Sequence, residues 1–300
     1  MPADTPTFTP PMAPVSTLQG QATRSASIYL VLSFLIAWVF WFLAWLHTRH
    51  FAIPIPLIIL VIIGSFGPFL GAGIGSWIEG GARGMLRFYA RALNLRMGWM
   101  VFLVSFCLLP ILAMGAELLR SSLAHAPFVF TMTWAALPMS YVFLFFLGGT
   151  LGEEYGWSYL SDKLDALLPL KPAVFALGAI WALWHLPLFF IIAPGLVQAY
   201  TPFYMFFLCT IALRFLFAWG YHRGGGSIMS NMLFHTASNL AYSLVVLAPS
   251  PGNPARDNYW YFTILCFLSA ILLWALFPVR RESDGSSGNI TRGSLRFPSV

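Results

Sequence analysis

Long runs of apolar residues, each bounded by polar or charged positions, recur along the chain. A helix needs about 20 apolar residues to cross the hydrocarbon core of a bilayer, so runs of roughly 18 or more mark candidate membrane spans. This criterion predicts about eight spans, at approximately residues 26–46, 56–78, 99–119, 134–154, 172–193, 201–219, 227–247 and 259–278. The pattern therefore predicts an all-α, polytopic integral membrane protein.

The two ends of the chain differ in composition from the apolar runs. Residues 1–25 are rich in Pro, Thr and Ala with almost no charge, and residues 279–300 are mostly small and polar. Such segments bury too little apolar surface to offset the entropy of ordering, so both are expected to be disordered cytoplasmic tails. The first apolar run is too long for the core of a signal peptide. We therefore expect one transmembrane domain, residues 26–278.

The composition supports the same class of protein. Hydrophobic residues make up 59% of the chain and charged residues 9%, with a mean hydropathy of +0.77. These values are typical of a membrane protein. The net charge of +6 fits contact with anionic lipid headgroups, and no basic groove interleaved with aromatic residues favours a nucleic-acid partner.

The distribution of basic residues predicts the orientation in the membrane. With a cytoplasmic N-terminus, the inside segments hold twelve basic residues and the outside loops three, and Arg214 lies within a span. Cytoplasmic loops carry an excess of Lys and Arg, so both termini are expected in the cytoplasm. The inside set is Arg24, Arg83, Arg87, Arg91, Arg96, Lys163, Lys171, Arg223, Arg280, Arg281, Arg292 and Arg296; the outside set is Arg49, Arg120 and Arg256.

The loop after the second span, EGGARGMLRFYARALNLRMG (residues 79–98), mixes arginines with apolar residues. Its arginines at 83, 87 and 91 are spaced four apart, which predicts an amphipathic helix on the cytoplasmic leaflet. Two interpretations stay open. The loop either only sets the topology, or it also docks a lipidated or membrane-proximal substrate.

Polar groups capable of catalysis lie within the apolar runs or at their ends. Glu153 and Glu154 directly follow a long apolar run, where adjacent carboxylates are costly. His185 and His235 lie in later runs, and Asn239 follows His235 by one helical turn on the same face. A single histidine in a span is more often a core residue, but acid, imidazole and amide together form a catalytic set.

Other unusual residues are expected to have structural roles. Cys107, Cys209 and Cys266 occur singly in apolar runs, which predicts neither a disulfide framework nor a thiolate metal site. Glu117 lies near Arg120 at the end of the third span, as expected for an ion pair at the membrane interface.

Three stretches around the polar groups resemble the three motifs of a known family. They are GEEYGWSYL (residues 152–160), FALGAIWALWHLPLFF (175–190) and HRGGGSIMSNMLFHTASN (222–239). The chain resembles the CPBP family of CAAX-processing and bacteriocin-processing intramembrane proteases over roughly residues 134–245, with weaker support from GSFGPFLGAGIGSW in the second span. The resemblance implies a helical body around a conical cavity, in the lipid bilayer, and a membrane-associated peptide or protein substrate.

The resemblance also implies a role for each polar group. Glu153 would be the general base that activates water, assisted by His185. His235 and Asn239 would stabilise the carbonyl oxygen, and Glu154 would support them. The family is also classed as metalloproteases, which would make Glu153, His185 and His235 ligands of a divalent metal such as zinc. Both mechanisms stay open, although the chain has no HExxH pair and the glutamate mechanism explains Asn239 better.

The chain departs from the family pattern at two positions. The first family motif is EExxxR, and Ser158 stands at the position of the arginine, where it cannot form a bidentate pair with a carboxylate. In the second motif Trp181 replaces the usual Phe. We predict that Arg214, at a similar depth, pairs with Glu154 and supplies the missing cation. The alternative is that Arg214 extends to the inner headgroups.

The sequence therefore predicts an intramembrane endopeptidase of the CPBP type that hydrolyses a substrate reaching it from the cytoplasmic half of the bilayer. The main alternative is a non-catalytic protein of the same fold, acting in bacteriocin self-immunity or as a membrane scaffold. A proton-coupled transporter is less well supported, because no inverted repeats or paired broken helices occur. The distribution of the family indicates the inner membrane of a bacterium, where prenylated substrates are not expected.

Overall fold

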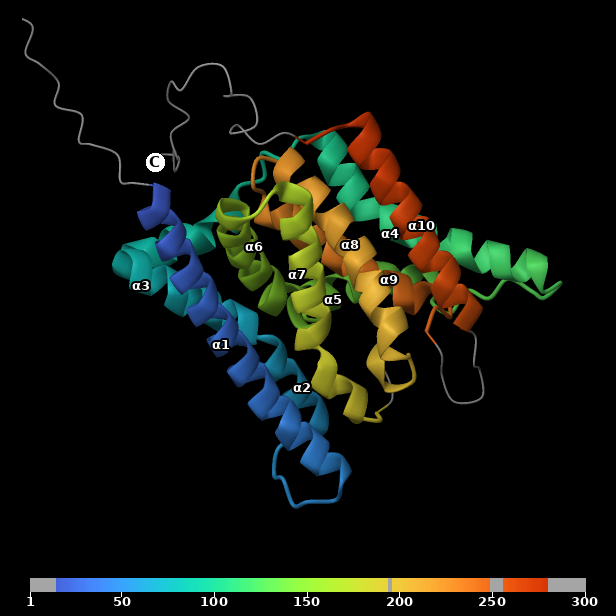
Figure 1. Cartoon of the computed structure of the whole chain (residues 1–300). Coiled ribbons are helices and arrows are strands. Elements are labelled where there is room, and N and C mark those ends of the chain that lie inside the picture. Colours follow the sequence, from blue (N-terminus) through green and yellow to red (C-terminus); the bar gives the residue numbers. More distant parts are fainter. Residues whose placement is uncertain (1–14, 194–195, 249–255, 280–300) are drawn as a thin grey trace, which may run out of the picture.

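The computed structural model describes residues 15–193, 196–248 and 256–279 as a bundle of helices (Figure 1). The α-helices are α1 (Val15–Thr48), α2 (Leu57–Ser65), α3 (Gly67–Ala90), α4 (Trp99–Leu123), α5 (Leu137–Leu147), α6 (Thr150–Leu167), α7 (Leu170–Trp184), α8 (Phe203–Arg223), α9 (Ile228–Leu244) and α10 (Arg256–Leu276). Short 3-10 helices are η1 (Arg91–Leu93), η2 (Trp134–Ala136), η3 (Leu186–Phe190) and η4 (Val197–Ala199). The described residues form no β-strand, only an isolated bridge between Phe130 and Val245.

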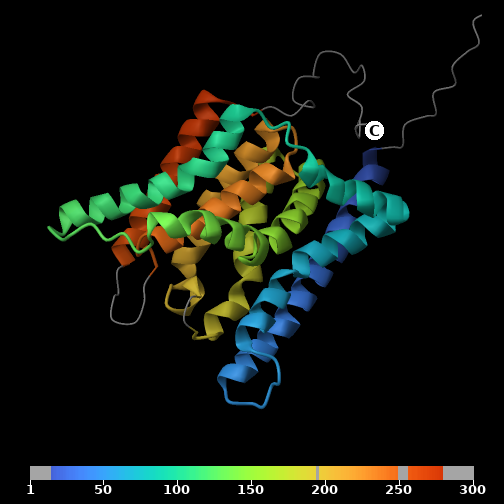
Figure 2. The same ribbon diagram turned by 180° about the vertical axis from the view of Figure 1, so that it is seen from behind.

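The helices fall into three groups that both views show (Figure 1, Figure 2). Helices α1, α2 and α3 lie on one side of the molecule, and α4 and α10 lie on the other. Helices α6 to α9 lie between them, and α6 contacts α1, α3, α7 and α9. The polar motifs of the sequence therefore lie on the central helices.

The predicted all-α membrane fold is confirmed, with a different number of spans. Six helical stretches of the described chain are long and apolar enough to cross a membrane, and a seventh counts if the bent pair Trp134–Leu147 and Thr150–Leu167 is one span. The predicted span 134–154 is therefore broken, with an angle of 51° between its two parts. The predicted span 227–247 corresponds to α9, whose 17 residues fall short of the 18 required.

The prediction of disorder up to residue 25 is wrong for residues 15–25. Helix α1 begins at Val15, directly after Pro14, and Ala22 and Ala26 are buried on its inner face. Ala26 follows Ala22 by four residues and Tyr29 follows Ala26 by three, so this segment shares the packed face of the membrane helix. Residues 1–14 and 280–300, the rest of the two predicted tails, lie outside the described residues.

Helix α3 bends at two glycines, and its second part forms the predicted amphipathic helix. Gly80 and Gly81 have non-helical dihedral angles, and Gly81 has a φ of +61°. Beyond the bend, Arg83 and Leu86 are exposed, while Phe88 packs into the core. The helix thus presents both arginine and leucine on its outer surface, as expected of a helix at a membrane interface.

Basic residues from separate predicted inside loops lie close together at one end of the molecule. Arg91 forms an ion pair with Asp162 of α6 and donates a hydrogen bond to the hydroxyl of Tyr221 in α8. Lys163 pairs with Glu79 at 2.6 Å. These contacts require the three segments to lie on the same side of any membrane.

The predicted pair of Glu117 and Arg120 is present, and its carboxylate is buried. Glu117 is 1% exposed and accepts hydrogen bonds from Arg120, from the backbone N–H of Val129 and from Asn258. The reason is that Asn258 of α10 and the segment after α4 cover the end of α4. Four donor contacts satisfy this carboxylate, which ties α4 to α10.

Glycines on one face of α6 allow it to approach α2 and α3 closely. A Cβ at Gly152 would lie 2.6 Å from the carbonyl oxygen of Ser65, and a Cβ at Gly156 would lie 2.6 Å from that of Pro68. Small residues four apart let helix backbones meet in membranes. This contact draws the first turns of α6 into the interior, where Gly152 to Ser161 are all buried.

We predict that Gly156→Ala destabilises the fold. The added Cβ must displace the backbone of Pro68, and overpacking of this kind costs about 1–3 kcal/mol. Thermal unfolding in detergent measures the effect. Gly115→Ala is the matched control, because its Cβ would meet only Leu265 Cδ1, at an ordinary 3.6 Å. Equal unfolding temperatures for the two variants would contradict the prediction.

Candidate active site

A break between two helices places the glutamates of the first motif. Helix α5 ends at Leu147, and Gly148 and Gly149 separate it from α6. Gly149 has a φ of +94°, which a residue with a side chain rarely adopts. Glu153 and Glu154 therefore lie in the first turns of α6, where the helix dipole favours negative charge.

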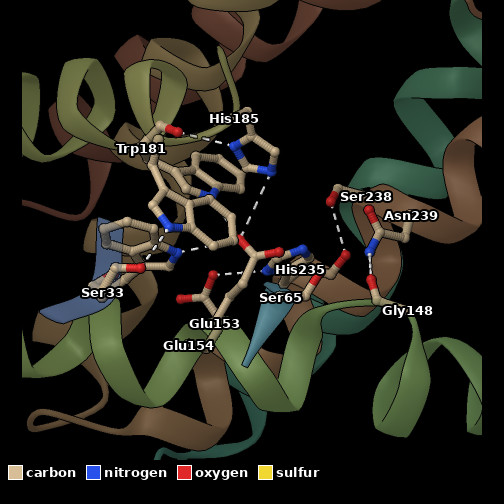
Figure 3. Close-up of polar contacts among 12 residues, drawn as sticks. Ser33, Ser65, Gly148, Glu153, Glu154, Trp181, His185, His235, Ser238 and Asn239 are labelled. Atoms are coloured by element: carbon tan, nitrogen blue, oxygen red, sulfur yellow. Dashed lines mark hydrogen bonds and ion pairs between the residues drawn. The ribbon is translucent and has the colours of Figure 1, made fainter. Parts of the chain in front are cut away.

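The two adjacent carboxylates point toward different partners (Figure 3). Glu153 is 4% exposed, and its Oε2 accepts hydrogen bonds from the indole N–H groups of Trp181 at 2.7 Å and Trp157 at 3.2 Å. His185 Nε2 lies 3.9 Å from the same oxygen. The donors that solvate Glu153 are thus neutral, and none of them is an ion-pair partner from Lys or Arg.

The hydrogen bond of His185 determines which ring nitrogen faces Glu153 as an acceptor. His185 follows the last residue of α7, and its Nδ1 lies 2.9 Å from the carbonyl oxygen of Trp181. A carbonyl only accepts, so Nδ1 carries the proton and the neutral ring presents the lone pair of Nε2. Both Nε2 and the carboxylate of Glu153 can therefore accept a proton from the same small donor.

Glu154 lies in a buried ionic cluster. Arg214 of α8 donates from Nη1 to Oε2 at 3.0 Å and from Nη2 to Oε1 at 2.7 Å. His235 Nδ1 lies 2.8 Å from the same Oε1. Glu154 is 0% exposed and Arg214 1%, so the predicted pair is present and the alternative of an arginine extending to the headgroups is wrong.

Ser158 stands in place of the motif arginine, and its hydroxyl accepts a hydrogen bond from Asn231 Nδ2 at 3.1 Å instead of bonding to either glutamate. Asn231 is buried, and its Oδ1 has no hydrogen-bond partner in the described part of the chain. We did not predict Asn231 from the sequence. Its position one turn before His235, on the same face of α9, is the signal that could have found it.

Asn239 lies at the edge of this group of residues and contacts the helix break. Its Nδ2 donates a hydrogen bond of 2.7 Å to the carbonyl oxygen of Gly148, and the residue is partly exposed. Figure 3 shows Asn239 and Gly148 beside His235. One of the two amide N–H groups of Asn239 is thus used within the protein, and the other is available to a ligand.

The backbone of Gly149 leaves room beside the two catalytic candidates. A Cβ built on Gly149 would lie 2.7 Å from Glu153 Oε1 and 3.9 Å from His235 Nε2. Because Gly149 has no Cβ, a small group can approach this oxygen and this nitrogen together. Glu153 Oε1 and His235 Nε2 therefore both lie beside Gly149, and His185 approaches the other oxygen of the same carboxylate.

The zinc alternative requires Glu153, His185 and His235 to surround one point. Among the described residues, no three His, Cys, Asp or Glu side chains are placed to hold a metal ion. Oε2 of Glu153 already accepts two indole N–H groups, and Nδ1 of His235 is bound to Glu154. The atoms left for a metal ion are therefore Nε2 of each histidine and Oε1 of Glu153.

The comparison with protein families identifies the segment that carries these residues. Residues 134–241 match the family described as Rce1-like, type II CAAX prenyl endopeptidase Rce1-like. This match confirms the resemblance to the CPBP and CAAX protease family over about a third of the chain. It covers the glutamates, both histidines and Asn239. No curated protein matches the chain.

We predict that Gly149→Ala inactivates the site without unfolding the protein. The methyl group would occupy the space next to Glu153 Oε1, and alanine is strained at this φ. Cleavage of a reporter substrate by the reconstituted protein measures the effect. Gly20→Ala is the control, because nothing lies within 4 Å of its Cβ. Wild-type activity of Gly149→Ala would show that this space is not used.

Proposed function

We propose that this chain, whose residues 134–241 belong to the CAAX protease family, is an intramembrane endopeptidase that uses Glu153 and His185 to activate water. The observation that carries the proposal is the separation of 3.9 Å between His185 Nε2 and Glu153 Oε2. Oε2 already accepts two indole N–H groups, so in the proposal the water donates one hydrogen bond to Oε1, beside Gly149, and the other to His185 Nε2. A transporter or a scaffold has no need of this arrangement.

In the proposed reaction, the water oxygen attacks the carbonyl carbon of the scissile peptide bond as Glu153 takes a proton from the water. His185 accepts a hydrogen bond from the second hydrogen of the water, which directs a lone pair of the water oxygen toward the carbonyl carbon. The new O–C bond turns the carbonyl oxygen into an oxyanion. When the C–N bond breaks, the proton on Glu153 moves to the leaving amine, so that the carboxylate is regenerated.

His235 and Asn239 stabilise the oxyanion in this proposal. His235 is held through Nδ1 by Glu154, which leaves Nε2 directed toward the space at Gly149. In its protonated form Nε2 donates to the oxyanion, and the free N–H of Asn239 adds a second donor. Donors fixed in advance in a low-dielectric interior stabilise developing charge more strongly than water does.

The proposed substrate is a membrane-associated peptide or protein that enters from the cytoplasmic half of the bilayer. The contacts of Arg91 with Asp162 and of Lys163 with Glu79 gather the predicted inside loops at one end of the molecule. An excess of basic residues is typical of a cytoplasmic face, which supports the proposal that both termini are cytoplasmic. The proposal of a bacterial inner membrane rests on the distribution of the family. The metal-dependent alternative has less support than the glutamate mechanism, because the candidate ligands do not converge.

We predict that Glu153→Gln lowers turnover about 100-fold or more, because it keeps the shape and removes the base. The measurement is the peptide-terminus profile of membranes that contain each variant, together with cleavage of a reporter in proteoliposomes. Glu79→Gln is the control: it removes a carboxylate that pairs with Lys163 instead of contacting the site. It should keep wild-type turnover.

An identical terminus profile for the wild type and Glu153→Gln would reject the protease. It would favour the non-catalytic alternative, bacteriocin self-immunity or a scaffold.

We predict that His235→Ala and Asn239→Ala each lower kcat and leave KM nearly unchanged. The loss of one oxyanion donor typically costs about 2.7–4 kcal/mol of transition-state stabilisation. Steady-state kinetics on one reporter peptide measure both constants. Ser238→Ala is the matched control on α9, since its hydroxyl only donates to the backbone of His235. A raised KM with unchanged kcat would assign the two residues to substrate binding instead.

A further inference from the structure

We infer that Arg214 is a positioning residue for His235 and acts on it through Glu154. The inference rests on the proposed function, and it assigns a part in the reaction to a residue of α8 that lies outside the three motifs. Arg214 does not touch the space at Gly149. Its effect reaches that space through one carboxylate and one imidazole.

The hydrogen bonds form a chain from α8 through α6 to α9. Arg214 holds both oxygens of Glu154, so the carboxylate cannot rotate without losing a bond to the guanidinium. His235 shares Oε1 with Arg214 Nη2, so the direction of its Nδ1 bond depends on where Arg214 fixes that oxygen. The orientation of Nδ1 sets that of Nε2 across the ring.

Burial makes the arginine necessary. A carboxylate that is fully buried carries a large desolvation penalty, which an ion pair offsets only when its hydrogen bonds are well formed. With Arg214 replaced by a neutral residue, Glu154 would keep only the hydrogen bond to His235 among those described above. A proton would then move between the Glu154 carboxylate and the His235 imidazole, or the two side chains would change their relative orientation. Either change would alter the protonation or the orientation of His235.

A second contact links Arg214 to the other glutamate. The guanidinium carbon lies 4.1 Å from the centroid of the Trp181 ring, and Nε1 of that ring donates to Glu153 Oε2. The cation thus fixes the indole that solvates the proposed base. Arg214 therefore contacts partners of both glutamates.

The backbone of α7 is shaped to admit this arginine. A Cβ on Gly178 would lie 3.2 Å from Ile211 Cα and 3.4 Å from Arg214 Cβ. Because Gly178 has no side chain, α8 can approach α7 closely. This approach places the aliphatic part of the Arg214 side chain against α7, with its guanidinium at Glu154 of α6. The position of the cation is therefore built into the packing of the helices.

Position 158 offers a second place from which a cation could reach the same carboxylate. Ser158 lies one turn after Glu154 on α6, so the two side chains share a face. The unpartnered Oδ1 of its neighbour Asn231 would accept a hydrogen bond from a guanidinium placed there. The location of the cation can therefore be tested by moving it.

The experiment measures kcat, KM and unfolding temperature for the wild type, Arg214→Gln, Ser158→Arg and the double variant. We expect Arg214→Gln to lower kcat on the order of 10- to 100-fold with little change in KM, as for other residues that orient a catalytic histidine. Ser158→Arg alone should also lower kcat, because two guanidinium groups would compete for one carboxylate. The double variant should recover most of the lost turnover.

Two further variants separate positioning from general stability. Arg214→Lys keeps the charge but loses the bidentate geometry, so it should fall between the wild type and Arg214→Gln. Thr210→Val removes a buried hydroxyl one turn earlier on α8 that bonds only to the backbone of Phe207, and it should not change kcat.

Two results would overturn the inference. One is wild-type kcat in Arg214→Gln; the other is a folded double variant no more active than Arg214→Gln. If the wild type cleaves no substrate, the proposed function fails, and the unfolding temperatures still test the pairing. Ser158→Arg should then stabilise Arg214→Gln and destabilise the wild type, whereas additive changes would reject a shared carboxylate.

Discussion

Two adjacent carboxylates buried in a largely apolar interior are the constraint on which the rest of the structure depends. Consecutive residues of a helix point about 100° apart, so Glu153 and Glu154 cannot share one set of donors. Each needs its own, and the donors come from three other helices: α7 for Glu153, and α8 and α9 for Glu154. The close approach of α6 to α2 and α3 at Gly152 and Gly156 holds the carboxylates where those helices meet.

The two carboxylates differ in the kind of donor they receive, and this difference separates their roles. Glu154 accepts bonds from an arginine and a histidine, which saturate it and keep it ionised. Glu153 accepts from neutral indoles on one oxygen and leaves the other beside the open space at Gly149. Among these bonds of the described residues, only Glu153 keeps one carboxylate oxygen without a donor, although the two residues are neighbours in the sequence.

The sequence was sufficient to predict the fold class, the residues that converge and the pair of Arg214 with Glu154. These follow from hydropathy, helical spacing and the cost of an unpaired buried charge. It was not sufficient for the break at Gly148 and Gly149, because glycines do not interrupt a hydropathy profile. The indole donors to Glu153 were also missed, since Trp157 and Trp181 look like packing residues until the backbone places them. The direction of Asn239 depends on the break, so it could not be predicted either.

The short length of α5 has a consequence for the bilayer around the protein. Helix α5 has 11 residues, none of them buried, and a helix of that length covers only about 16 Å. The hydrocarbon core of a bilayer is about 30 Å thick, so the lipid beside α5 meets a hydrophobic surface roughly half its own thickness. Mismatch of this sign is relieved by local thinning of the bilayer. Thinning beside α5 shortens the distance between the headgroups with their water and Gly149, which follows the end of this helix by two residues.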